Sequence, residues 1–381
     1  MKIAIIVTDV NTFDGVNRVG ADLITMLKMH GHDVAVCSWT PRADETFEEF
    51  MKVDNFYVAS GHSKRSKGRL IKSLFLSRSS IRKCLKDVNP DVFIGVGSEP
   101  AVFSSVPNGK VKVQFVHFPT EFFMEVRSSL IHLLYRALYW HYHYQQLPRF
   151  DAVVCNSEYT REITYLIWGK TVQEEKLKVI YPAIDVDRFE RERREKKNQI
   201  CCVGRLSKTK GVEHAVKAFM QVYSDYNLKM ILAGSPSVNL QLRLNWEKEL
   251  KPFIEGLIRD GAPIELKIKP SYSTVINTLL ESKAMVNYSR YEHFGVVPVE
   301  SQAAGCPPIV SNSGGQKETV EHGKTGFRVD KPEELSKYLR VLLDDEEMWK
   351  RMSDNGRLMA KNFSFDKISN QWQTLLTQLK K

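Results

Sequence analysis

Short runs of consecutive apolar residues, each followed by a segment with helical spacing, recur along this chain. The first run covers residues 2–7, apolar residues then follow at helical spacing between positions 19 and 27, and a second run lies in residues 31–38. Strands that read as continuous apolar runs are typical of parallel sheets buried on both faces. The alternation therefore predicts βαβ units and an α/β fold.

The alternation restarts after the middle of the chain. A charged stretch at residues 187–199, poor in apolar residues, is interpreted as a linker. A length of 381 residues suits two domains of roughly 150 to 200 residues each. We therefore predict two doubly wound, Rossmann-like parallel-sheet domains facing across a cleft, at residues 1–185 and 186–364. The expected strands lie within residues 2–7, 31–38, 91–97, 111–117 and 151–157, and then within residues 200–206, 228–234, 264–270, 282–289 and 306–312.

Composition limits the partners and the compartment. A net charge of +10 favours an anionic partner, either nucleic acid, a membrane surface or a phosphorylated substrate. The six cysteines show no CxxC spacing, which predicts reduced, mostly buried thiols and neither zinc nor disulfides. No apolar run approaches the ~20 residues of a membrane span, and polar residues without a cleavage site follow the first run. We expect a cytosolic protein, or one attached to a membrane from that side.

Residues 291–318, YEHFGVVPVESQAAGCPPIVSNSGGQKE, place acids around the expected start of a helix. Pro298 suits the first helical position, and Gly305 suits the C-terminal cap. Because ligands bind beyond the carboxyl ends of parallel strands, the free amides of this helix start predict an anion site. Glu300 in the first turn and Glu292 before it can hold hydroxyls beside a phosphate, as a nucleotide sugar requires. Alternatively, Glu300 only complements the helix dipole and Glu292 is a solvated acid.

Two cations follow the first strand of the second series. Arg205 comes directly after the run at residues 200–204, and Lys210 precedes a helix with apolar residues at 212, 215, 216 and 219. Arg grips phosphate oxygens through two bonds and Lys adds a mobile charge. The pair can therefore neutralise a diphosphate, although an Arg–Lys pair in a loop is also common as surface charge.

The motifs together resemble the family-4 retaining glycosyltransferases of the GT-B fold. The resemblance covers nearly the whole chain, and its motifs occur in the order typical of that family. They read VIYPAIDVDRF at residues 179–189, GRLSKTKG at 204–211, EHFGVVPVE at 292–300, AAGCPPIV at 303–310 and SGGQKETVEHGKTGF at 313–327.

This resemblance implies the roles of the second-domain candidates. Arg205 and Lys210 would bind the donor diphosphate, Glu300 the ribose hydroxyls, and Glu292, as a catalytic residue, the donor sugar. Backbone amides would lie near the sugar and the phosphate at Phe294, Gly295, Val296 and Val297. The donor expected first is GDP-mannose, with UDP-sugars next, and the enzyme would be a hexosyltransferase.

Two positions in the first domain also match the family. His117 ends the run at residues 111–117, and in the family the matching imidazole sits beside the anomeric carbon. Its VHFP context resembles mannosyltransferases that build lipid-linked oligosaccharides on polyprenyl diphosphate, although a strand-end His is often structural. Gly15 would let the first loop approach the diphosphate. The family usually has Gly-Gly there, whereas this chain has Asp14-Gly15.

The family mechanism predicts that neither a metal nor another cofactor is needed. Breaking the bond from C1 to phosphate builds an oxocarbenium-like sugar, as in glycosidases, while negative charge grows on the diphosphate. Arg205, Lys210 and the helix amides are the groups expected to stabilise that charge. The sequence also contains Asp185-Val186-Asp187, but it follows IYPAI in the hinge motif, so we interpret it as structural.

Two segments of the first domain bear on the acceptor. Residues 63–86 carry nine Lys or Arg and no acid, interleaved with apolar residues, and residues 122–147 are rich in aromatics. A basic amphipathic segment can lie on an anionic membrane surface. We therefore expect a polyprenyl-linked or other glycan acceptor, with core packing plus a solvated face as the alternative for both segments. As in the family, residues 365–381 are expected to form a helix that packs back on the first domain.

Three other classes of protein are alternatives to a glycosyltransferase. A basic nucleic-acid-binding protein would use residues 63–86, but no helix-turn-helix, zinc-finger or RNA-binding signature is present, so we expect no nucleic acid partner. A dinucleotide-dependent enzyme would need a GxGxxG after the first strand, which is absent. A nucleotide-sugar epimerase of the same architecture is the nearest alternative, and it would need further acid–base carboxylates in the cleft.

Overall fold

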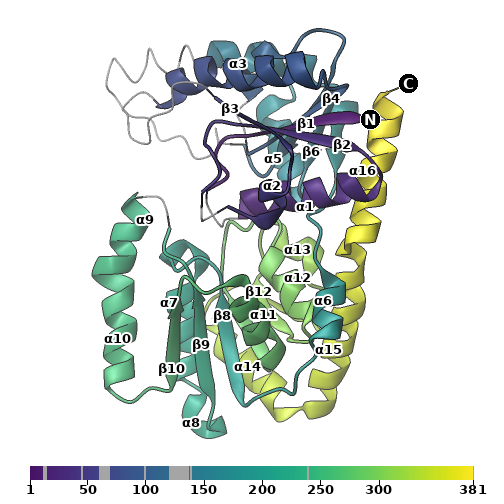
Figure 1. Cartoon of the computed structure of the whole chain (residues 1–381). Helices are drawn as coiled ribbons and strands as arrows, with labels where there is room; N and C mark the ends of the chain where they lie inside the picture. The colour runs from purple at the N-terminus through teal and green to yellow at the C-terminus, as the bar shows by residue number, and fades with distance from the viewer. Residues whose placement is uncertain are drawn as a thin grey trace. The chain divides into compact units, whose positions relative to one another are not determined.

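The computed structural model describes residues 1–11, 15–43, 46–59, 69–97, 100–119, 137, 140–237 and 240–380, apart from the side chains of residues 69–77, 101 and 240. The chain forms two compact units (Figure 1). The first consists of Met1–Ala183 with Phe365–Lys381, and the second of Ile184–Ser364. Each unit is built on one parallel sheet, so the predicted α/β fold with two Rossmann-like sheets is confirmed.

The first sheet has seven strands in the order β3-β2-β1-β4-β5-β6-β7. Every pairing is parallel, and Ile5 lies between Val36 and Ile94 of the two neighbouring strands. The strands are β1 (Lys2–Val7), β2 (Asp33–Ser38), β3 (Asn55–Val58), β4 (Val92–Val96), β5 (Val111–Val116), β6 (Ala152–Cys155) and β7 (Leu177–Val179).

Helices cover both faces of this sheet, and alternate residues of β1 serve the two cores. Ile3 and Ile5 pack with α1 (Gly15–Met29), α2 (Glu48–Met51) and α16 (Phe365–Leu379), whereas Ala4 and Ile6 pack with α3 (Arg69–Asp87), η1 (Pro100–Ser105) and α5 (Glu158–Trp168). Figure 1 shows α1 and α3 on opposite sides of the strands. Among the described residues, this unit also contains helical residues 140–146 and the short 3₁₀ turns η3 (Leu147–Arg149) and η4 (Glu174–Lys176).

The C-terminal helix α16 belongs to the first unit. Ile368, Trp372, Leu375 and Leu376 are buried in its core, and the Trp372 ring lies 5.9 Å from that of Phe115. Burying side chains of this size contributes about 1.5–3 kcal/mol each, so the helix is held by its apolar stripe.

The second sheet has six strands in the order β10-β9-β8-β11-β12-β13. In sequence rank this is 3-2-1-4-5-6, the order of dinucleotide-binding folds, and it places a topological switch point between β8 and β11. The strands are β8 (Gln199–Val203), β9 (Lys229–Gly234), β10 (Ile264–Ile268), β11 (Ala284–Asn287), β12 (Pro308–Ser311) and β13 (Phe327–Val329).

The helices of the second unit alternate with these strands. Side-chain caps fix where several begin: Ser271 accepts from the amide of Thr274 at 3.2 Å, and Asp345 accepts from that of Met348 at 2.8 Å. The helical segments are α6 (Val186–Arg191), η5 (Lys208–Lys210), α7 (Val212–Met220), α8 (Tyr223–Tyr226), α9 (Leu240–Asn245), the π-helical η6 (Trp246–Leu250), α10 (Lys251–Arg259), α11 (Tyr272–Glu281), α12 (Val296–Ala303), α13 (Gln316–Thr319), α14 (Glu334–Asp344), α15 (Glu346–Ala360) and η7 (Lys361–Phe363).

Three strands were absent from the sequence prediction, namely β3, β7 and β13. All three lie at sheet edges and have three or four residues. An edge strand is exposed along one side and does not need a continuous apolar run. Apolar patterns therefore predict the central strands and the edge strand β10, and they miss these three short edge strands.

The linker prediction for residues 187–199 needs correction. Helix α6 occupies its first part, and the Asp185 carboxylate accepts from the amide of Arg188 at 3.1 Å as its N-cap. This capping role agrees with the structural interpretation of the Asp185-Val186-Asp187 sequence.

The basic segment at residues 63–86 is described in its second part only, as α3. Ile81 is buried in the core and Leu85 packs against it, while Arg82, Lys83 and Lys86 are exposed. These residues therefore combine a packed apolar side with exposed cations, an arrangement that both alternatives share. Most of the aromatic segment at residues 122–147 lies outside the described residues. No helix in the described part of the chain combines the length and apolarity that a membrane span requires.

The six cysteines agree with the prediction from their spacing. All are buried and none is in a disulfide. Burial raises the pKa of the Cys202 thiol to about 12, as expected of an unreactive core thiol.

Candidate functional site

The switch point of the second sheet brings three predicted residues together. Arg205 and Lys210 follow β8, Glu292 follows β11, and these two strands are neighbours. The Lys210 Nζ donates to Glu292 Oε2 at 2.6 Å. Residues 82 positions apart in the sequence therefore meet because parallel strands end at the same edge.

The backbone geometry at Gly211 allows Lys210 to lie close to Glu292. This glycine follows η5 with φ +69°, a conformation that side chains with a Cβ rarely adopt. A Cβ at this position would lie 2.3 Å from the carbonyl oxygen of Tyr288, just beyond β11. The missing side chain therefore lets the Lys210 loop approach the segment that carries Glu292.

The ion pair is mostly sheltered from solvent, with 23% of the Lys210 side chain and 18% of the Glu292 side chain exposed. Burial alone would raise the pKa of Glu292, but Lys210, with His293 and Arg205, outweighs it, so the pKa is lowered. The carboxylate is therefore ionised at neutral pH. The exposed Arg205 is a second cation that acts on this carboxylate.

His293 was not selected from the sequence, although it lies within the quoted EHFG motif. Burial lowers its pKa to about 4, with Lys210 and Arg205 acting in the same direction and Glu292 opposing them. The imidazole is therefore neutral at pH 7. It can accept a hydrogen bond from a ligand hydroxyl without adding charge.

The shift at His293 predicts a pH dependence of stability. The unfolded chain protonates this residue below its ordinary 6.5, whereas the folded chain does so only below about 4. Folding stability should therefore fall as pH decreases through this window, by on the order of 3 kcal/mol. Urea unfolding between pH 7 and 4.5 measures it, as the difference between wild type and His293→Gln.

The shift at Glu292 also lowers folding stability as pH decreases, but chiefly below the ordinary pKa of 4.5 of this residue. The two effects can therefore be separated by pH. If His293→Gln keeps the wild-type slope between pH 7 and 4.5, the assignment of the shift to His293 is wrong.

The turn before α12 differs in detail from the prediction. Gly295 adopts φ +99° as the N-cap, so the helix begins at Val296, and Pro298 is its third residue instead of its first. Proline is tolerated there because the first four amides of a helix have no partner within it. Glu300 is the fifth residue and lies beyond the first turn. Gly305, with φ +63°, follows the helix end as expected.

The helix start carries the remaining candidates. Phe294 is 2% exposed, and its ring lies edge-on to Phe363 at 5.4 Å. Val296 and Val297 are half-buried. Glu300 is 6% exposed, and its Oε1 accepts from the hydroxyl of Tyr272 at 2.8 Å, a partner that the sequence did not indicate.

The structure places two predicted residues in the first unit. His117 follows β5 and is half-buried, its ring lies 4.9 Å from that of Phe115, and its carbonyl oxygen accepts from Thr160 Oγ1 at 3.4 Å. Gly15 begins α1, and a Cβ there would meet no atom within 4 Å. Its neighbour Asp14 lies outside the described residues.

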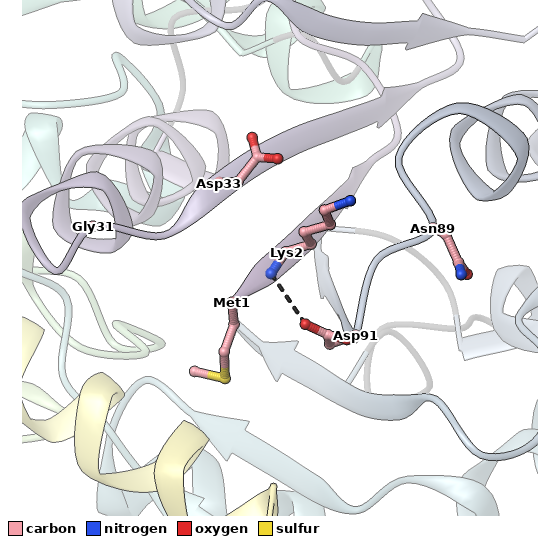
Figure 2. Close-up of a pocket in the computed structure, with 6 residues that line it drawn as sticks. All are labelled: Met1, Lys2, Gly31, Asp33, Asn89 and Asp91. Atoms are coloured by element: carbon pink, nitrogen blue, oxygen red, sulfur yellow. Dashed lines mark hydrogen bonds between the residues drawn. The ribbon is translucent and has the colours of Figure 1, made fainter.

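A polar pocket in the first unit lies at the opposite end of the strands. Figure 2 shows Lys2 and Asp33, the first residues of β1 and β2, with Asn89 and Asp91 before β4. The amide of Lys2 donates to Asp91 Oδ2 at 3.2 Å. Because ligands of such sheets bind at the carboxyl ends, this pocket is not the candidate site.

The described residues contain no group of three or more His, Cys, Asp or Glu that could hold a metal ion. The cations near Glu292 are side chains, namely Lys210 and Arg205.

Two family models match the chain, one over each half. Residues 13–188 match the model "Glycosyltransferase Family 4", and residues 183–359 match "Glycosyl transferases group 1".

Curated relatives are similar at modest identity. The alpha-1,3/1,6-mannosyltransferase alg-2 of Neurospora crassa is 26% identical over 284 residues, which is 64% of this chain and 59% of the relative. The match thus spans about three fifths of that relative's length. An uncharacterized glycosyltransferase of Haemophilus influenzae is 24% identical over 390 residues, covering 98% of this chain and 99% of the relative.

Solved structures share the fold. That of Anabaena Alr3699/HepE in complex with UDP-glucose has a TM-score of 0.73 and 17% identity, over 98% of this chain and 99% of that one. The structure of WaaG, a glycosyltransferase involved in lipopolysaccharide biosynthesis, has a TM-score of 0.70 and 15% identity, over 98% and 99%. These likenesses establish the two-sheet GT-B architecture.

Proposed function

The chain belongs to the GT-B glycosyltransferases, with a family 4 half and a group 1 half, and we propose that it transfers a sugar from a nucleotide-sugar donor to a glycan acceptor with retention at the anomeric carbon. Mannose from GDP-mannose is the favoured donor group, because one relative is an alg-2 mannosyltransferase. The complex of HepE with UDP-glucose makes a UDP-sugar the second candidate.

The observation that carries this proposal is the Lys210–Glu292 pair at the switch point, beside the start of α12. Lys210 and Arg205 bind the diphosphate, and the amides at the start of α12 add their positive dipole end. Glu292 orients the hydroxyls of the donor sugar, and Glu300 receives the ribose. Such a set binds phosphates and hydroxyls together, which is what a nucleotide sugar presents.

The proposed mechanism uses these charges without a metal. As the bond between C1 and the phosphate oxygen breaks, its electron pair leaves with the diphosphate. Lys210 and Arg205 stabilise this growing negative charge, and the ionised Glu292 faces the sugar that becomes cationic. His117 in the first unit is the proposed catalytic residue from that half of the chain.

The acceptor is proposed to be a lipid-linked glycan, met at an anionic membrane surface on the cytosolic side. The exposed Arg82, Lys83 and Lys86 of α3 support attraction to such a surface, because each cation near anionic lipid adds ~1 kcal/mol. Sedimentation with anionic vesicles at low salt, lost at high salt, is the expected behaviour. Absence of binding at low salt contradicts the membrane part and leaves the donor proposal standing.

A panel of nucleotides tests the donor proposal directly. GDP, UDP, GDP-mannose and UDP-glucose are added to the protein during thermal unfolding, each with and without EDTA. A ligand at 100 times its Kd stabilises the native state by about 2.7 kcal/mol, which raises the Tm by several degrees. We expect one nucleotide series to give this shift, and EDTA to leave it unchanged.

The panel also separates the parts of the proposal. A shift that EDTA abolishes contradicts metal independence. AMP and inorganic pyrophosphate serve as controls for unspecific anion binding. If no nucleoside diphosphate or nucleotide sugar shifts the Tm beyond these controls, the donor proposal is wrong.

A further inference from the structure

Tyr272 holds the carboxylate that the proposed function assigns to the ribose. It is the first residue of α11, and the Ser271 cap fixes where that helix begins. Its hydroxyl donates to Glu300 Oε1 at 2.8 Å. Glu300 is 6% exposed, so this bond lies in a sheltered place, where a hydrogen bond counts for more than in water.

The other side of Tyr272 is held by helix α6. The Arg188 guanidinium lies over the phenol ring, 5.5 Å from its centroid. Arg188 is itself fixed twice, because its amide donates to Asp185 at 3.1 Å and its Nε donates to Glu192 at 2.9 Å. The capped helix thus presents a cation to the face of the ring, which stabilises the ring's orientation.

We propose that Tyr272 is a positioning residue for the donor nucleoside, which sets the Glu300 carboxylate for the two ribose hydroxyls and is steadied by Arg188. The inference rests on the proposed function, because it requires a nucleotide donor. Through it, the Asp185-Val186-Asp187 segment acquires a role in donor recognition by way of α6, without ligating a metal.

The chemistry explains why a carboxylate in this place needs a holder. An ionised carboxylate has about four lone-pair sites, and a ribose diol uses two donors at a fixed spacing. A carboxylate that rotates about its side-chain torsions presents these sites in several directions. With Oε1 bonded to Tyr272, one rotamer is favoured, and the ordering cost is met before the nucleotide binds.

Tyr272→Phe tests the inference, with GDP and UDP as probes beside their 2′,3′-dideoxy forms. Losing the hydrogen bond that orients Glu300 should weaken binding of the ribonucleotide with the higher affinity by about 10-fold. The dideoxy form lacks the diol, so its affinity should change little. The ratio of the dissociation constant of the dideoxy form to that of the ribonucleotide should therefore fall by a similar factor. In turnover, the KM for the donor should rise while kcat at saturation stays near wild type.

Tyr226→Phe is the matched control. Tyr226 also donates from its phenol to a carboxylate, Asp344 Oδ1 at 2.7 Å, but on the surface at α8. This variant should keep the wild-type ratio. Arg188→Met provides a second test that leaves both the phenol and Glu300 in place, and it should lower the ratio by a smaller factor. The Tm of each variant without nucleotide reports whether it is folded.

The possible outcomes distinguish failure of the Tyr272 inference from failure of the proposed function. A wild-type protein that binds no nucleoside diphosphate removes both. A wild-type protein that prefers ribose, with Tyr272→Phe and Arg188→Met keeping the full preference, overturns the role of Tyr272 and leaves the donor proposal intact. A ratio that falls in both variants and not in Tyr226→Phe supports the inference.

Discussion

Replacing Lys210 with alanine is expected to lower sugar transfer by about 10²- to 10³-fold, the usual effect of removing one preorganised group that stabilises developing charge. Lys210 lies 2.6 Å from Glu292 at the switch point of the second sheet, with Arg205 nearby. Its loss removes a cation from the diphosphate in the ground state and more strongly in the transition state. Both the affinity for the nucleotide and kcat should therefore fall.

The same substitution changes the electrostatics of the unliganded site. The Glu292 carboxylate, 18% exposed, loses its closest cation, and burial then acts against its charged form. Its pKa should rise relative to wild type. At pH values above the ordinary pKa of this carboxylate, the variant should therefore have a lower free energy of unfolding than wild type. The loss should be smaller than the ~3–5 kcal/mol that breaking a fully buried pair costs.

Lys217→Ala is the matched control for Lys210→Ala. Lys217 also pairs with a glutamate of the second unit, Glu213 at 2.8 Å, but its side chain is 56% exposed on α7. Transfer should stay at the wild-type level in this variant. A Lys210→Ala protein that is folded and turns over at the wild-type rate would refute the diphosphate role.

The sequence predicted those parts of this site that follow from strand order alone. Arg205, Lys210 and Glu292 lie in the loops that follow two central strands with continuous apolar runs, and strands that are parallel neighbours bring such loops to one edge. The edge strands β3, β7 and β13 escaped because Asn55, Lys178 and Arg328 leave each of them without an apolar run of more than three residues.

Contacts between side chains of packed helices were beyond the reach of the sequence. Tyr272 meets Glu300 across 28 residues because α11 and α12 pack together, and no periodicity encodes which phenol reaches which carboxylate. His293 was visible within its motif, but its lowered pKa depends on burial and on two cations from another loop. The start of α12 was misplaced because Gly295, with φ +99°, caps the helix ahead of Pro298.

Replacing His117 with alanine is expected to separate transfer from donor binding. His117 follows β5 in the first unit, whereas Arg205, Lys210, Glu292 and Glu300 all belong to the second. Transfer should fall by about 10²-fold or more if the imidazole acts on the reacting sugar. The Tm shift by nucleoside diphosphates should remain, because their proposed ligands are untouched.

The local structure around His117 makes this a clean substitution. Its ring contacts the edge of Phe115, whose own ring is buried and packs near Trp372, and its carbonyl oxygen remains available to Thr160. The lost ring contact should cost about 0.5–1.5 kcal/mol of stability beyond the loss of the buried side-chain area. His30 of the same unit is the control, because it is also half-buried and its ring lies 6.5 Å from that of His32, and His30→Ala should transfer sugar at the wild-type rate. Full turnover by a folded His117→Ala protein would show that the histidine is structural. An equal loss of nucleotide binding and of transfer would show that it acts on donor binding and not on the chemical step.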